Sequence, residues 1–141
     1  MKNQLRIFKG QFYKPTLKTH IMETNVGFKT GMRITEAMKR KSELKRTGHI
    51  FWNDPGHAWL EVDRSDLKLL GIDKQISGYS YQDNNTGKVY LEEDQDAGIY
   101  LNAIFPDALN NAEFQQFRGK YINDQYREND IFVRRLRHYN K

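Results

Sequence analysis

The sequence predicts a small α+β domain in which a mainly antiparallel sheet packs against two or three helices. Alternating apolar and polar residues, typical of half-buried strands, recur at 57–63, 76–82 and 88–93. Between and around these strands lie segments with helix-capping residues at their ends. The 141 residues suffice for one domain with one core, which two Trp, eight Tyr and eight Phe help to fill.

Residues 1–50 read as a basic extension or subregion ahead of the central unit. Residues 4–13 predict a strand, and residues 16–33 predict a loop or a short strand at 25–29. A helix is predicted over residues 35–47, because a threonine opens this segment and a glycine follows it.

A turn of composition Asn-Asp-Pro-Gly at 53–56 leads into the central unit, residues 56–105, whose first strand is predicted over 57–63. Asp63 or Ser65 is expected to cap a short helix that ends at Leu70, with Gly71 in a left-handed conformation after it.

The second half of the central unit predicts a hairpin and a helix. The hairpin joins strands 76–82 and 88–93 through a turn rich in Asp, Asn and Gly. Asp96 is expected to cap the helix 97–105, which a proline stops.

The C-terminal region predicts a short helix over 112–118 and a strand over 130–139. The predicted core consists of Trp59, Leu60, Val62, Leu67, Leu70, Ile76, Tyr79, Tyr81, Val89, Leu91, Leu101, Ile104 and Val133.

Composition limits the function classes. The chain has no cysteine, which excludes a disulfide scaffold, a thiolate nucleophile and a cysteine-based zinc or iron–sulfur site. No apolar run approaches the length that spans a bilayer, and the N-terminus does not resemble a signal peptide. We therefore expect a cytoplasmic protein without a cofactor.

Charge is distributed unevenly along the chain. Residues 1–50 hold 12 Lys and Arg against 3 Asp and Glu, whereas residues 51–112 hold 4 against 11. A basic face would attract nucleic acid or a nucleoprotein complex, and the alternative is neutralisation of the basic residues by the acidic middle. The candidate binding residues are Lys39, Arg40, Lys41, Lys45, Arg46, Arg134, Arg135 and Arg137.

An acidic cluster follows the hairpin. Glu92, Glu93, Asp94 and Asp96, together with His57, form a candidate metal or acid–base site. Capping of the following helix explains these carboxylates better, because acidic side chains are stabilised at helix N-termini.

The pair GHIFW and GHAWL places His49 and His57 eight residues apart, so that they could meet across a bend. Two histidines without a third ligand are a weak metal signal, and rim positions for the histidines with Trp52 and Trp59 in the core are the favoured interpretation. The sequence also contains no nucleophile elbow, phosphate-binding loop or dinucleotide-binding turn.

Several motifs extend through the central block and the C-terminal FVRRLRHY. Their positions are Gly56, His57, Trp59, Leu60, Val62, Leu70–Ile72, Ser77, Tyr79–Tyr81, Tyr90–Asp94, Asp96 and Ala97. In these residues the chain resembles a group of small uncharacterised proteins of bacteria, plasmids and phages. The resemblance covers the central third and the tail. It implies no catalytic residue, only an accessory gene of a mobile element, where counter-defence proteins are common.

The leading hypothesis is a non-enzymatic binding protein that engages nucleic acid or a nucleoprotein complex, for example as an inhibitor of a host defence nuclease such as a CRISPR effector. One alternative is a metal-dependent hydrolase that uses His57 and the cluster Glu92–Asp96. Another is a protein–protein adaptor whose acidic middle docks on a basic partner.

Overall fold

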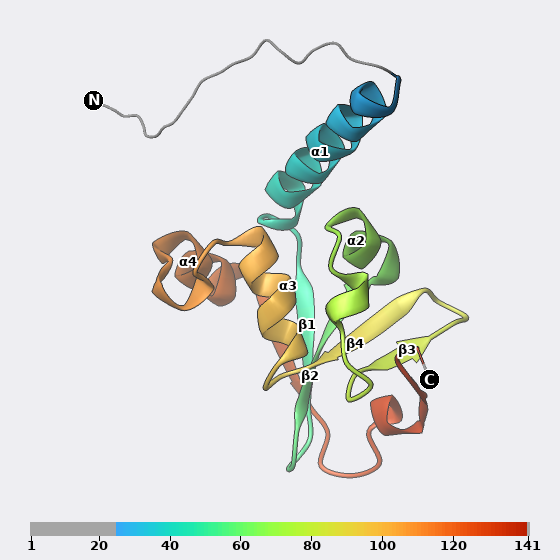
Figure 1. Cartoon of the computed structure of the whole chain (residues 1–141). Coiled ribbons are helices and arrows are strands. Elements are labelled where there is room, and N and C mark those ends of the chain that lie inside the picture. The colour runs from blue at the N-terminus through green and yellow to red at the C-terminus, as the bar shows by residue number, and fades with distance from the viewer. Residues whose placement is uncertain (1–24, 141) are drawn as a thin grey trace. The chain divides into compact units, whose positions relative to one another are not determined.

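The computed structural model describes residues 25–140, with side chains from residue 34 onward. The chain divides into two units, Met1–Glu36 and Ala37–Lys141. Helix α1 (Asn25–Leu44) begins in the first unit and ends in the second (Figure 1). The strand predicted over residues 4–13 lies outside the described residues.

The prediction of a loop or strand at 25–33 is wrong, because α1 starts at Asn25. Gly27 and Gly31 favoured a loop, but each glycine costs a helix only about 1 kcal/mol relative to alanine. The helix also ends three residues before the predicted Thr47, whose hydroxyl donates a hydrogen bond of 2.8 Å to the carbonyl of Glu43.

The second unit is built on a six-stranded sheet with the order β5-β1-β2-β4-β3-β6. Every neighbouring pair is antiparallel except β1 and β5, which confirms the predicted fold class. The strands are β1 (His49–Asn53), β2 (Ala58–Asp63), β3 (Tyr81–Asp83), β4 (Lys88–Glu92), β5 (Ile122–Tyr126) and β6 (Arg137–His138).

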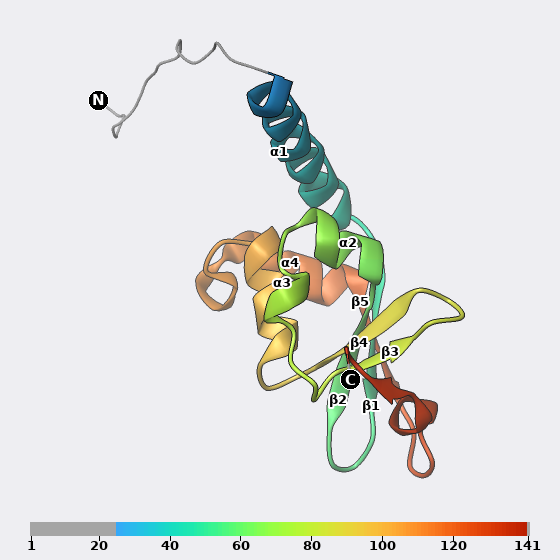
Figure 2. The ribbon, with the colours of Figure 1, turned by 45° about the vertical axis from the view of Figure 1, so that its right-hand side comes forward.

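One face of the sheet carries the main core. Alternation along β2 directs Leu60 and Val62 to this face, and Val89 and Leu91 join them from β4. Helices α2 (Arg64–Leu69), α3 (Asp96–Ile104) and α4 (Ala112–Tyr121) also belong to this core (Figure 2). Their large buried side chains, with Phe105 directly after α3, are Leu67, Tyr100, Ile104, Phe105, Phe114 and Phe117.

The opposite face of the sheet is aromatic and is covered by the C-terminal segment. Trp59 and Tyr90 form a second cluster there with Ile131 and Val133. The strand predicted over 130–139 is wrong: residues Phe132–Arg135 form a 3₁₀ turn, and only Arg137–His138 pair with the sheet. A 3₁₀ turn that buries two alternate apolar residues imitates the period of a strand.

The central unit follows the prediction in its order of elements. Asp63 precedes α2 as expected, but its side chain makes no capping hydrogen bond. Gly71 has a φ of 74°, and the amide of Ile72 donates to the carbonyl of Leu67, as expected at a helix C-terminus. The hairpin forms, although its first strand begins only at Tyr81. Tyr79 was predicted in the core but is 72% exposed.

Strands β1 and β5 are absent from the prediction. β5 is a polar edge strand with the sequence INDQY, so it lacks the alternation that identifies a half-buried strand. Among the described residues, no helix is long and apolar enough to cross a membrane.

Candidate functional site

The nominated basic residues lie in two separate places. Those in α1 and in the turn directly after it precede the start of β1 at His49, whereas Arg134 pairs with Asp54, directly after the end of β1. The two groups therefore lie at opposite ends of one strand and do not form a continuous basic face.

Four of the nominated basic side chains form ion pairs. Arg40 donates two hydrogen bonds, of 2.7 and 3.0 Å, to the buried carboxylate of Asp66. Lys45 pairs with Glu113, Arg134 with Asp54 and Arg135 with Asp130. Within the described part of the chain, Lys39, Lys41 and Arg46 form no ion pair.

The two histidines of the repeated Gly-His motif do not meet. The β1–β2 register pairs Asn53 with Ala58, which places His49 and His57 at opposite ends of the hairpin. His49 is buried, with its Nδ1 2.8 Å from the carbonyl of Thr47 and its Nε2 2.8 Å from the hydroxyl of Tyr100. Because a carbonyl only accepts, Nδ1 carries the proton and Nε2 accepts from Tyr100.

Burial lowers the pKa of His49 below its ordinary value of 6.5, against the opposing hydrogen bond to Thr47. The unfolded chain therefore binds a proton that the folded protein does not, and stability falls as pH drops below about 6.5. We expect a slope of up to about 1.4 kcal/mol per pH unit from this group. Urea unfolding at several pH values between 7.5 and 5.5 measures it, and His49→Gln should reduce the slope. Equal slopes in the two proteins would contradict the assignment.

Asp96 is not the helix cap that the sequence predicted. Its carboxylate is fully buried in the first turn of α3 and accepts hydrogen bonds from the amide and hydroxyl of Ser77 and from the hydroxyl of Ser80. Glu92 covers the start of α3 instead, accepting from the amides of Asp94 and Gln95. Asp96 thus holds the loop that carries Tyr79.

The acidic cluster does not converge with His57 on a metal site. Asp96 is enclosed, and Glu93 is exposed outside the residues that line the pocket at His57. Across residues 34–140, no group of three or more His, Asp or Glu side chains is placed to hold a metal ion.

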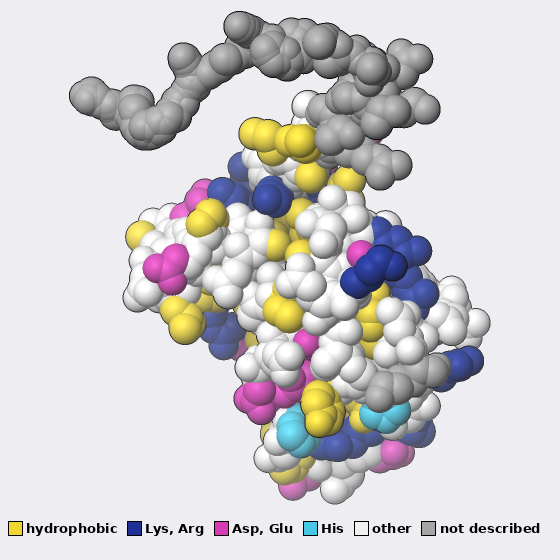
Figure 3. Space-filling model, in the orientation of Figure 1, with side chains coloured by type: hydrophobic (Ala, Val, Ile, Leu, Met, Phe, Trp, Pro, Cys, Tyr) yellow, Lys and Arg dark blue, Asp and Glu magenta, His cyan; other side chains and the backbone are white. Residues whose placement is uncertain are grey.

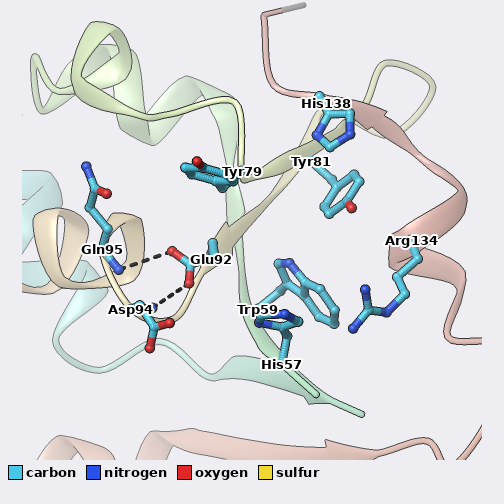
Figure 4. A pocket seen from close by; sticks show the side chains of 9 residues that line it. All are labelled: His57, Trp59, Tyr79, Tyr81, Glu92, Asp94, Gln95, Arg134 and His138. Carbon is cyan, nitrogen blue, oxygen red and sulfur yellow. Dashed lines mark hydrogen bonds between the residues drawn. The ribbon is translucent and has the colours of Figure 1, made fainter. Parts of the chain in front are cut away.

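A pocket of about 500 Å³ opens on the aromatic face of the sheet. In Figure 3, histidine side chains flank hydrophobic and basic side chains at its mouth, with acidic side chains beside them. Figure 4 shows the residues that line it: His57, Trp59, Tyr79, Tyr81, Glu92, Asp94, Gln95, Arg134 and His138.

Sheet register brings the rings of this pocket together. Trp59 pairs with Glu92 across β2 and β4, and Tyr81 pairs with His138 across β3 and β6. Because paired residues share a face, these side chains project from the same side of the sheet. Their rings form a row, with centroids 6.0 Å apart for His57 and Trp59, 6.0 Å for Trp59 and Tyr81, and 4.7 Å for Tyr81 and His138.

Arg134 is fixed in the pocket by two contacts. Its Nε and Nη2 donate to the carboxylate of Asp54 at 2.6 and 3.2 Å, and its guanidinium lies 5.0 Å from the centre of the Trp59 ring. The Arg134 hydrogen bond, with the amides of His57 and Gly56, lowers the pKa of Asp54 to about 2. Asp54 therefore stays ionised, and Nη1 of Arg134 remains available to an anion.

The pocket offers four kinds of recognition. Trp59 forms a buried floor, Tyr79 an exposed ring at the rim, Arg134 a positive charge, and Gln95 and Asp94 polar groups at the edge. Of the nominated site residues, the structure places four here: His57, Glu92, Asp94 and Arg134. Sequence reasoning missed Tyr79, which it assigned to the core, and Asp54, which it read only as a turn residue.

Comparison with known proteins finds no matching family model, no similar curated protein and no similar solved structure.

Proposed function

We propose that the protein binds single-stranded nucleic acid, and that the aromatic pocket, rather than the basic helix α1, is its principal binding site. The observation that carries the proposal is the row of rings on one sheet face, with an immobilised arginine beside it and the exposed Tyr79 at the rim. Aromatic platforms next to a cationic group suit stacked bases and their phosphates.

The local chemistry supports a single strand rather than a duplex. Tyr79, Tyr81 and His138 offer ring surfaces at the mouth of the pocket, and bases reach such surfaces only when they are unpaired. Gln95 and Asp94 at the edge supply donors and acceptors suited to the polar edge of a base. Electrostatic attraction alone would be weak here, because Asp54 neutralises much of the charge of Arg134.

The proposal includes a biological setting, that of a protein encoded by a mobile element. A nucleic-acid site in a protein of a mobile element fits an inhibitor that engages the nucleic-acid component of a host nuclease complex in the cytoplasm. The resemblance to small proteins of plasmids and phages supports this setting, and the pocket supplies the contact that such an inhibitor needs.

Fluorescence anisotropy with labelled single-stranded RNA and DNA, and with the matching duplexes, tests the proposal at low and moderate salt. We expect single strands to bind more tightly than duplexes. Tyr79→Ala should weaken binding about tenfold or more, since stacking on one aromatic ring contributes about 1–3 kcal/mol.

The matched control is Tyr126→Ala. Tyr126 is 55% exposed on β5, at the opposite edge of the sheet from β6, and its hydroxyl bonds Glu128. Its removal should leave binding unchanged. Absence of binding at low salt, or equal affinities of Tyr79→Ala and the unsubstituted protein, would overturn the proposal in favour of a protein partner.

A further inference from the structure

We infer that the pocket prefers guanine among the unpaired bases it binds, and that the carboxylate of Asp94 is the group that recognises it. This inference rests on the proposed binding of single-stranded nucleic acid and adds base specificity to it. The rings of the pocket do not supply that specificity, because every base has a π-face and stacking tolerates all of them. A base preference therefore has to come from the polar side chains at the edge of the pocket.

Among the carboxylates at the pocket, that of Asp94 is the one available to a ligand. Both oxygens of Glu92 are occupied, because they accept from the backbone amides of Asp94 and Gln95 at 2.9 and 3.2 Å. The carboxylate of Asp54 is held by Arg134. Asp94 lines the pocket and is exposed, and within the described part of the chain its carboxylate has no hydrogen-bond or ion-pair partner.

Hydrogen bonds tie the loop that carries Tyr79 to the segment that carries Asp94. The hydroxyl of Ser80 accepts from the amide of Glu92 at 2.9 Å and donates to the carboxylate of Asp96. Residues on both sides of Asp94 are therefore bound to the residue next to Tyr79. Figure 4 shows Tyr79 and Asp94 on the same side of the pocket, and both belong to its lining. A base stacked on the Tyr79 ring has its polar edge toward this segment.

Guanine is the base whose edge matches a carboxylate. Its N1–H and its exocyclic amino group are adjacent donors, and one carboxylate accepts from both in a bidentate pair. Adenine and cytosine place an acceptor nitrogen beside their amino group, whereas uracil and thymine place a carbonyl on each side of their single N–H. Each of these bases brings an acceptor against the carboxylate. The amide of Gln95 both donates and accepts, so it does not discriminate by itself.

The distribution of charge orients a nucleotide in the same sense. Figure 4 shows Arg134 on the side of the pocket opposite Asp94. The guanidinium attracts the phosphate backbone and the carboxylate repels it, so the base edge rather than the backbone faces Asp94. The pocket volume of about 500 Å³ lies within the range of sites that enclose a small molecule, which leaves room for one purine base.

The experiment measures the affinity of the full-length protein for single-stranded oligouridines that carry one central guanosine, inosine or adenosine, by fluorescence anisotropy at one salt concentration. We expect the guanosine strand to bind about tenfold more tightly than the adenosine strand, the usual effect of a bidentate contact to a base edge. Inosine keeps the N1–H but lacks the amino group, so its strand should bind with intermediate affinity. A single guanosine in each strand prevents pairing between strands.

Variants identify the group responsible. Asp94→Asn keeps the shape of the side chain but replaces one acceptor with a donor, which suits the edge of adenine instead of that of guanine. The ratio of the two affinities, guanosine strand to adenosine strand, should fall about tenfold. Glu93→Gln is the matched control, because it removes the same charge from an exposed neighbour that does not line the pocket. It should leave the ratio unchanged.

The possible results separate this inference from the proposed function. Equal binding of the guanosine, inosine and adenosine strands overturns the preference for guanine and leaves the binding function standing. A preference for guanosine that survives in Asp94→Asn, or that Glu93→Gln abolishes as well, overturns the role of Asp94. If none of the strands binds, the proposed function fails and this inference fails with it.

Discussion

Replacing Asp96 with alanine is expected to lower the free energy of unfolding by about 3 kcal/mol. The carboxylate is fully buried and accepts three hydrogen bonds, two from Ser77 and one from Ser80. The substitution leaves the amide and hydroxyl donors without their acceptor and also removes a negative charge from the first turn of α3. Oδ1 has no hydrogen-bond partner among the described residues, which limits the loss.

Urea unfolding followed by circular dichroism measures this loss, with Asp94→Ala as the control. Asp94 is two residues away and exposed, so its removal should change stability by no more than about 0.5 kcal/mol. On the proposed function, Asp96→Ala should also weaken the binding of single-stranded nucleic acid, because Ser77 and Ser80 flank Tyr79. Equal stabilities of the two variants would show that the buried carboxylate does not anchor this loop.

Replacing Trp59 with alanine is expected to cost about 3–5 kcal/mol, the usual range for deleting a buried tryptophan. The side chain is 2% exposed and packs in the cluster with Tyr90, Ile131 and Val133, which joins the C-terminal segment to the sheet. Its loss would open a cavity beneath the pocket and deprive the guanidinium of Arg134 of the ring that it covers.

The variant Trp59→Phe tests how much of the loss of stability comes from the cavity that alanine leaves. Phenylalanine fills much of the cavity, so that this variant should be clearly more stable than Trp59→Ala in the same urea measurement. Trp52→Ala is a second comparison. Trp52 is only half-buried and lies against Phe132 and Glu61, so its removal should cost less. If the Trp59→Ala variant were as stable as the Trp52→Ala variant, Trp59 would not be the residue that joins the C-terminal segment to the sheet.

The sequence predicted structure correctly where the conformation depends only on residues within one short segment. Gly71 ends α2 with a positive φ, and the Asp-Asn-Asn-Thr-Gly turn closes the hairpin with Gly87 at a φ of 77°. Both depend on backbone conformations that few residues adopt, so composition alone reveals them. The pattern in β2 and β4 likewise identified Leu60, Val62, Val89 and Leu91, which face the main core, but not Tyr90, which is buried on the opposite face.

The errors arose where distant segments decide the structure. The sequence around Tyr79 predicts a core residue. In the structure, Asp96 holds Ser77 and Ser80 by hydrogen bonds, and the Tyr79 side chain is exposed to solvent. Arg134 reads as one of several basic residues, and only its contact with Asp54, 80 positions earlier, distinguishes it. No local pattern carries the information for either contact.

By itself, therefore, the sequence determined the α+β class, the hairpin, the glycine that follows α2 and most of the sheet core, because these follow from periodicity and backbone preference within a few residues. Tertiary structure alone decided the site. The strand order β2-β4-β3-β6 brings His57, Trp59, Tyr81 and His138 to one sheet face, and the folded C-terminal segment adds Arg134. Pairing between strands that are far apart in the chain depends on how they pack together, and this cannot be predicted from the sequence of any one segment.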